Sequence, residues 1–153
     1  LGTEATIYDG EAQWLTAGSG AEHEEMPGGE RILGTQLWLN LPAKYKMSAP
    51  PAYHSISNRE IKEFEFKGGR LRLITGKYEN EEVWQGKYLP LDFYDIHLED
   101  NASVEIPVRE GLSAFAFTLC GEVINSGKNV EEKTAAKLGD GDRVLLETQN
   151  NKA

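Results

Sequence analysis

The feature that most constrains this chain is a series of short segments in which apolar and polar residues alternate. Phe64 and Phe66 alternate with charged neighbours, and Tyr94, Ile96 and Leu98 do the same further along the chain. Successive side chains of a β-strand point to opposite faces, so a period of two is typical of a strand with one buried face. Many short strands at nearly regular spacing predict an antiparallel sandwich or barrel. The sequence therefore predicts an all-β fold.

The same reasoning assigns strands along most of the chain, with one ambiguous stretch. Residues 129–138 have a helix-favouring composition with Asn129 as an N-cap, while an edge strand would suit an all-β fold, and both alternatives stay open. In 115–119 we predict Phe115, Phe117 and Leu119 on one face, with Cys120 buried at the end of the strand. The predicted strand segments are 12–17, 32–41, 63–67, 70–73, 94–99, 103–108, 115–119 and 144–146.

A proline-rich stretch predicts a domain junction. Pro42, Pro50 and Pro51 bracket a segment that is unsuited to a central strand, because proline lacks the backbone N–H and fixes φ. We therefore divide the chain into residues 1–42, a connection at 43–53 and a domain at 54–153.

Composition argues against several function classes. The formal net charge is -9, so a phosphate backbone would be repelled unless a basic patch opposed that field. The pairs Lys44 with Lys46 and Arg70 with Arg72 are too small for a nucleic-acid footprint. No apolar run approaches the roughly 20 residues that a membrane helix needs. Cys120 is the single cysteine, which fits a cytoplasmic protein, or a nuclear one in a eukaryote.

The candidate chemistry centres on His23-Glu24-Glu25. In a strand His23 and Glu25 would project to the same face, and an imidazole beside a carboxylate supplies two ligands for a divalent metal. Three or four ligands are the norm, and the alternative interpretation is a solvated acidic edge. We interpret His54 as an interdomain or surface residue, and His97 with Asp95 as a surface or barrel-mouth pair.

The residues around this pair resemble the signature of the pirin family. Gly10-Glu11-Ala12-Gln13-Trp14-Leu15-Thr16-Ala17-Gly18 leads into His23-Glu24-Glu25-Met26-Pro27, and Gln36-Leu37-Trp38-Leu39-Asn40-Leu41-Pro42 follows. Other similar blocks, in the same order, are Pro50-Pro51-Ala52-Tyr53, Gly76-Lys77-Tyr78, Tyr94-Asp95-Ile96 and Gly121-Glu122-Val123. The resemblance extends from about residue 10 to residue 146.

The resemblance implies a cupin double-stranded β-helix barrel architecture, because pirins are bicupins. It implies a partial N-terminal barrel in residues 1–42 and an intact C-terminal barrel in 54–153. In the family a metal is held in the first barrel by three histidines and one glutamate. His23 and Glu25 match the last histidine and the glutamate, whereas no histidine precedes His23 to supply the earlier His-x-His motif.

The function implied by the resemblance is that of a metal-dependent dioxygenase related to quercetin 2,3-dioxygenase. Iron is the expected divalent metal, a flavonol-type small molecule the expected substrate, and Glu25 the expected ligand and proton acceptor. Because half of the ligands are absent, we expect weak or no activity from this chain. The alternative is a non-enzymatic protein-interaction module or transcriptional co-regulator. An incomplete first barrel would expose Trp14 and Leu37 and favour a homo-dimer.

Overall fold

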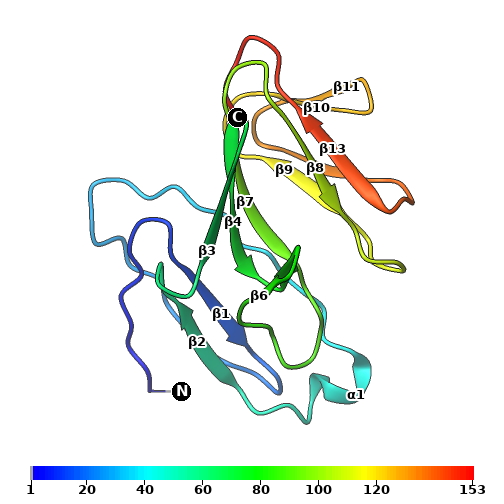
Figure 1. Cartoon of the computed structure of the whole chain (residues 1–153). Helices are drawn as coiled ribbons and strands as arrows, with labels where there is room; N and C mark the ends of the chain where they lie inside the picture. Colours follow the sequence, from blue (N-terminus) through cyan, green and yellow to red (C-terminus); the bar gives the residue numbers. More distant parts are fainter. Residues whose placement is uncertain (1) are drawn as a thin grey trace.

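The computed structural model describes residues 2–153 and is built almost entirely from β-strands, as the sequence predicts (Figure 1). The strands form one four-stranded sheet in the order β11-β10-β13-β8, one three-stranded sheet in the order β3-β4-β7, and the pairs β1-β2, β9-β12 and β5-β6. The elements are β1 (Ala12–Thr16), α1 (Ala43–Lys46), β2 (Ala52–Ile56), β3 (Lys62–Phe66), β4 (Gly69–Thr75), β5 (Lys77–Tyr78), β6 (Glu81–Glu82), β7 (Phe93–Leu98), β8 (Ser103–Pro107), β9 (Phe115–Thr118), β10 (Val123–Asn125), β11 (Lys128–Val130), β12 (Thr134–Lys137) and β13 (Arg143–Glu147).

Strand β4 is the centre of the molecule and is buried on both faces. Its residues Leu71 and Leu73 are 0% exposed and pack with Val104 and Ile106 of β8. The three-stranded sheet therefore packs against the β8-β13 pair, and the apolar side chains of both close the main core. The alternation that predicted these strands from the sequence also supplies the face that makes this contact.

The opposite face of β4 packs against the pair β1-β2, which lies beside the three-stranded sheet in Figure 1. Ile74 of β4 and Ile56 of β2 belong to a second buried cluster, and Ala12 of β1 packs against it. On this face the buried Arg72 side chain bonds both to Gly10, just before β1, and to Asp95 on the neighbouring strand β7 of its own sheet. Its guanidinium donates to the Gly10 carbonyl at 2.7 Å and lies 3.0 Å from an Asp95 oxygen.

The predicted strands 63–67, 70–73, 94–99, 103–108 and 144–146 are confirmed by β3, β4, β7, β8 and β13. The ambiguous stretch 129–138 is not a helix, because it contributes to strands β11 and β12. Lys133 turns the chain between them with a positive φ of 59°. Strand β12 then pairs with β9, which satisfies its backbone hydrogen-bonding groups.

Phe115 and Phe117 share one face of β9, as predicted for residues 115–119. Phe115 and Phe117 alternate as expected but are exposed, and Thr118 is the buried residue of β9. Strand β9 pairs with β12 within the described part of the chain, and the buried Thr118 hydroxyl donates to the Val130 carbonyl at 3.1 Å. Cys120, which the sequence placed at the buried end of this strand, is also exposed.

The predicted strand at 32–41 is also wrong. Residues 21–42 contain no strand or helix, and in Figure 1 this lighter blue segment runs as a loop beyond the strands. The sequence alternates there, but no neighbouring strand of residues 2–153 offers hydrogen-bonding partners, and a single strand cannot satisfy its backbone alone. Trp38 is 85% exposed and Leu37 is 55% exposed.

The proline-rich connection contains the short helix α1 and leads directly into β2. Strand β1 pairs with β2 over its whole length, so the segments before and after the connection share a sheet. The division into 1–42, 43–53 and 54–153 stays a prediction, since this pairing does not locate a boundary. No helix in residues 2–153 combines the length and apolar character needed to cross a bilayer.

Candidate functional site

The candidate site is built on the two-stranded ribbon β1-β2. In its antiparallel register Trp14 lies opposite His54, while Gln13 lies opposite Ser55 and Leu15 opposite Tyr53. Because directly opposed residues share a face, one face of the ribbon carries Trp14 and His54 and the other carries Gln13, Ser55 and Tyr53.

The Trp14 face anchors the ribbon to the rest of the protein. The ring of Trp84 stacks on His54 with centroids 4.6 Å apart and meets Trp14 edge-on at 5.2 Å. Such aromatic contacts are worth about 0.5–1.5 kcal/mol beyond the area they bury. Gly86 lets this packing close, because a β-carbon at that position would lie 2.5 Å from the Trp14 ring. Trp14 is therefore half-buried rather than exposed as predicted.

The opposite face carries a chain of polar contacts that ends on Glu25. The Gln13 side-chain amide donates to Glu25 Oε1 at 2.6 Å. The Tyr53 hydroxyl donates to Gln13 Oε1 at 3.2 Å, and the Ser55 hydroxyl donates to the Tyr53 oxygen at 3.2 Å. This arrangement ties the loop that contains Glu25 to the ribbon.

The chain reaches this position through a tight turn after β1. Gly18 has a φ of +54°, and a β-carbon there would lie 1.9 Å from the Ala49 carbonyl oxygen. Only glycine tolerates both the left-handed backbone and this close approach. The Gly20 amide then donates to the Ala17 carbonyl at 2.9 Å, which closes the turn. The turn at Gly18 and Gly20 therefore directs the chain back toward the ribbon just before His23.

His23 and Glu25 both lie outside any strand and are exposed, so the strand alternation used to pair them does not apply. An imidazole and a carboxylate suit a divalent first-row metal by type. Within residues 2–153, however, no group of three or more His, Cys, Asp or Glu side chains is arranged to hold a metal ion. The described residues alone do not fit a complete metal centre, and the assignment of His23 and Glu25 as ligands stays a prediction.

The two other histidines form carboxylate pairs elsewhere. His54 Nε2 lies 3.1 Å from Glu60 Oε1, and His97 Nε2 lies 3.2 Å from Asp95 Oδ2, as the spacing of that pair suggested. The Ser57 backbone N–H and hydroxyl, followed by the charge of His54, lower the pKa of Glu60 below its ordinary 4.5. These contacts make His54 a packed residue of the ribbon.

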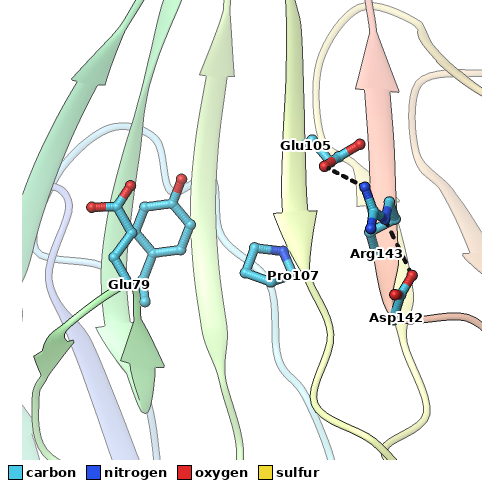
Figure 2. Close-up of a pocket in the computed structure, with 6 residues that line it drawn as sticks. Glu79, Glu105, Pro107, Asp142 and Arg143 are labelled. Atoms are coloured by element: carbon cyan, nitrogen blue, oxygen red, sulfur yellow. Dashed lines mark hydrogen bonds and ion pairs between the residues drawn. The ribbon is translucent and has the colours of Figure 1, made fainter.

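A separate hollow of about 310 Å³ lies between β5 and the β8-β13 pair. Figure 2 shows Glu79 on one side of it and Glu105, Arg143 and Asp142 on the other, with Pro107 between them. Arg143 lies 3.1 Å from Glu105 and 3.2 Å from Asp142, so its charge is already balanced by two carboxylates. The hollow contains neither His23 nor Glu25 and has no excess positive charge for an anionic ligand.

Sequence reasoning missed Gln13 as the hydrogen-bond partner of Glu25, and it missed Tyr53 and Ser55, which are linked to Gln13. Gln13 and Tyr53 lie 40 positions apart in the sequence, and only the β1-β2 register brings them together. The one available signal was Gln13, a polar residue that directly precedes Trp14 in the predicted strand 12–17. The Gln13 amide donates a hydrogen bond to the Glu25 carboxylate. A donor of this kind fixes the orientation of a glutamate that binds a metal or acts as a base.

Comparison with known proteins gives the site its family context. A sequence model of the family described as Pirin matches residues 1–39. The chain is 31% identical to pirin from Homo sapiens, over 99% of this chain and 53% of that protein. It is 32% identical to a predicted quercetin 2,3-dioxygenase from Thermoplasma acidophilum, over 98% of this chain and 66% of that protein.

The fold matches as well. The crystal structure of a quercetin 2,3-dioxygenase from Acinetobacter baumannii superposes with a TM-score of 0.76 at 25% identity, over 94% of this chain and 53% of that chain. The predicted all-β cupin fold is thereby confirmed. The chain spans 36% to 66% of the length of the first curated relatives that it matches. On sequence and fold together, this chain belongs to the pirin family.

Proposed function

We propose that this chain is part of a metal-dependent pirin-type cupin whose chemistry is that of a flavonol dioxygenase. The observation that carries the proposal is that Glu25 follows His23 by two positions in a segment that matches the pirin family, and that the β1-β2 ribbon holds the Glu25 carboxylate through Gln13. Two of its relatives carry quercetin 2,3-dioxygenase in their names. Iron is the metal that we propose.

In this proposal His23 and Glu25 bind a metal ion, and the Gln13 amide orients the Glu25 carboxylate. A bound divalent metal would supply a Lewis acid for a deprotonated flavonol oxygen. His23 and Glu25 would contribute one nitrogen and one carboxylate ligand, and Glu25 would also accept a proton. Because the described residues supply two donors where three or four are the norm, we propose that the chain by itself has weak or no turnover.

The test follows quercetin absorbance with the purified chain and added ferrous, manganese or nickel ions. The result that supports the proposal is turnover no faster than that of Glu25→Gln under the same conditions. Turnover that depends on metal and is at least tenfold above Glu25→Gln would overturn the inactivity of this chain while supporting the ligand role. Glu24→Gln is the matched control, since Glu24 is exposed next to Glu25.

A second candidate function is supported by the exposed apolar side chains between residues 26 and 39. Met26 is 79% exposed and Ile32 is 65% exposed, in a segment without strands. Exposed apolar patches of this kind mark protein contacts in many soluble proteins. The partner that best complements a chain with a net charge of -9 is a basic protein surface. In this alternative the chain is an interaction module or co-regulator without catalysis.

The same segment also favours self-association, which we propose as a homo-dimer through residues 32–39. Light scattering across a concentration series tests it, with Trp38→Ser as the interface variant and Phe117→Ser, on the exposed face of β9, as the control. A dimer that is lost in Trp38→Ser alone supports this interface. A mass equal to one chain at every concentration would contradict the proposal and leave a basic protein partner as the alternative for the exposed segment.

A further inference from the structure

The contact between Gln13 and Glu25 has a defined direction. The NH₂ end of the Gln13 amide faces the carboxylate of Glu25, which accepts only, and its carbonyl end faces the Tyr53 hydroxyl, which donates. Ser55 donates in turn to the Tyr53 oxygen. The three donors therefore point one way along the ribbon, from Ser55 through Tyr53 and Gln13 to Glu25.

The ribbon gives this relay a rigid base. Gln13, Tyr53 and Ser55 stand on one face of β1-β2, while the other face is fixed by the stacking of His54 on Trp84 and the contact of Trp14 with the same ring. Tyr53 and Ser55 are half-buried, whereas Gln13 and Glu25 are exposed. A half-buried Tyr53 and Ser55 behind the exposed contact between Gln13 and Glu25 form an arrangement that can position a functional carboxylate.

The loop that carries Glu25 has little else to hold it. No backbone-to-backbone hydrogen bond of the described residues involves residues 21–41. In residues 2–153 the Gln13 amide is the hydrogen-bond donor of the Glu25 carboxylate, and neither His23 nor Glu24 has a hydrogen-bond partner. The Gln13 hydrogen bond therefore fixes the position of the Glu25 carboxylate, and not that of Glu24.

We propose that Gln13 is a positioning residue for Glu25, and that Tyr53 and Ser55 set the direction of the Gln13 amide. The inference deepens the proposed function, because its importance for chemistry rests on the role of Glu25 given there. The hydrogen bond itself does not depend on a metal. The Gln13 amide holds Glu25 Oε1, while Oε2 has no hydrogen-bond donor among residues 2–153.

The first test measures the hydrogen bond in the full chain by ¹H–¹⁵N NMR without added metal. A carboxylate acceptor moves the protons of a donor amide downfield. We expect the Gln13 side-chain amide signal to move upfield in Glu25→Gln and in Tyr53→Phe, and to stay in place in Glu24→Gln. An unchanged signal in Glu25→Gln, or an equal shift in Glu24→Gln, would overturn the proposal. Retained spectra for β4 residues confirm that each variant is folded.

The second test uses manganese ion alone as the probe. If Glu25 is a ligand, Mn²⁺ should broaden the signals of residues 21–27, and Gln13→Leu should weaken binding by about tenfold, the lower end of what loss of such a supporting partner produces. Equal Mn²⁺ affinity in the wild type and Gln13→Leu would overturn the positioning role. Wild-type protein that binds no Mn²⁺ while the metal-free NMR result holds would contradict the proposed role of Glu25 as a ligand in this chain, but not the Gln13–Glu25 contact.

Discussion

Two regions of this molecule differ in how their apolar residues are used. In β4 Leu71 and Leu73 are fully buried between two sheets. Between residues 32 and 39 a similar alternation leaves Leu37 and Trp38 largely exposed, because no strand lies alongside. The candidate ligands His23 and Glu25 belong to the same strand-free stretch. The comparison indicates that the stability of the chain comes from the packed sheets, while its candidate chemistry lies in a loop tied to them by the β1-β2 ribbon.

The largest change in the free energy of unfolding is expected when one leucine from each region is replaced and the two variants are compared. Leu73→Ala removes a fully buried side chain from the main core and should lower the free energy of unfolding by about 3–4 kcal/mol. Leu37→Ala removes an exposed one and should change it by less than about 0.5 kcal/mol. Urea unfolding followed by circular dichroism measures both. Similar losses for the two variants would show that residues 32–39 are packed in solution, contrary to this account.

The next effect concerns the polar link between the layers. Arg72→Met removes the hydrogen bonds from the guanidinium to Gly10, Glu63, Asp95 and Asn58, and we expect a loss of about 2–3 kcal/mol. Part of the loss is offset because Glu63 and Asp95 remain in contact with water. The control is Arg70→Met, which removes an exposed arginine of the same strand. If both variants unfold at the same urea concentration, the link does not contribute as described.

A smaller effect tests the turn that returns the chain toward Glu25. Gly18→Ala forces a side chain into a left-handed conformation beside the Ala49 carbonyl, and should lower the free energy of unfolding by about 1–2 kcal/mol. It should also displace the Glu25 loop, so the NMR signal of the Gln13 side-chain amide should move. Gly28→Ala is the control, since its β-carbon would meet no atom within 4 Å. A stable variant with an unmoved Gln13 signal would break the connection proposed between this turn and the site.

The smallest effect is a dependence of stability on pH at the end of the ribbon. The folded state lowers the pKa of Glu60, chiefly through the Ser57 N–H and hydroxyl. This carboxylate therefore stabilises the fold above its ordinary pKa of 4.5, and the contribution is lost as the pH falls through the lower folded value. Glu60→Gln should be less stable than wild type by a few tenths of a kcal/mol at pH 7, because the carboxylate is solvent-screened, and the difference should shrink below pH 4.5.

Urea unfolding between pH 3 and pH 7 measures this difference, with Glu65→Gln on the exposed side of β3 as the control. A gap between wild type and Glu60→Gln that widens toward acid pH would contradict the assigned direction of the Glu60 pKa.

The sequence predicted those strands in which apolar and polar residues alternate and for which the fold supplies a neighbouring strand. Phe64 and Phe66 in β3 and Val104 and Ile106 in β8 alternate, and each strand finds neighbours, so the pattern sufficed. Residues 32–41 carry the same signal, yet a strand forms only where another chain segment pairs with it. The alternation of apolar and polar residues within 32–41 does not predict whether a segment that could pair with it exists.

Burial on a given face depended in the same way on distant residues. Arg70 and Arg72 look equivalent in the sequence, but Arg72 faces the Gly10 carbonyl and the ribbon while Arg70 faces solvent. The alternation of Phe115 and Phe117 predicted a shared face, but it did not predict that this face of β9 is exposed.

The candidate site was predictable only in its acidic and histidine residues. The motif drew attention to His23 and Glu25 through their resemblance to the pirin signature. The support of Glu25 by Gln13 and Tyr53 needed the register of β1 with β2, which no local pattern encodes.

This chain has the fold of a pirin-family cupin, and we propose that it supplies only part of a metal centre. The most direct measurement is the metal content per chain, by elemental mass spectrometry of protein purified without a metal-binding tag. We expect a value near zero, because residues 2–153 hold no group of three or more candidate metal-binding side chains. A value near one metal per chain would contradict this proposal, and would mean that His23 and Glu25 obtain further ligands.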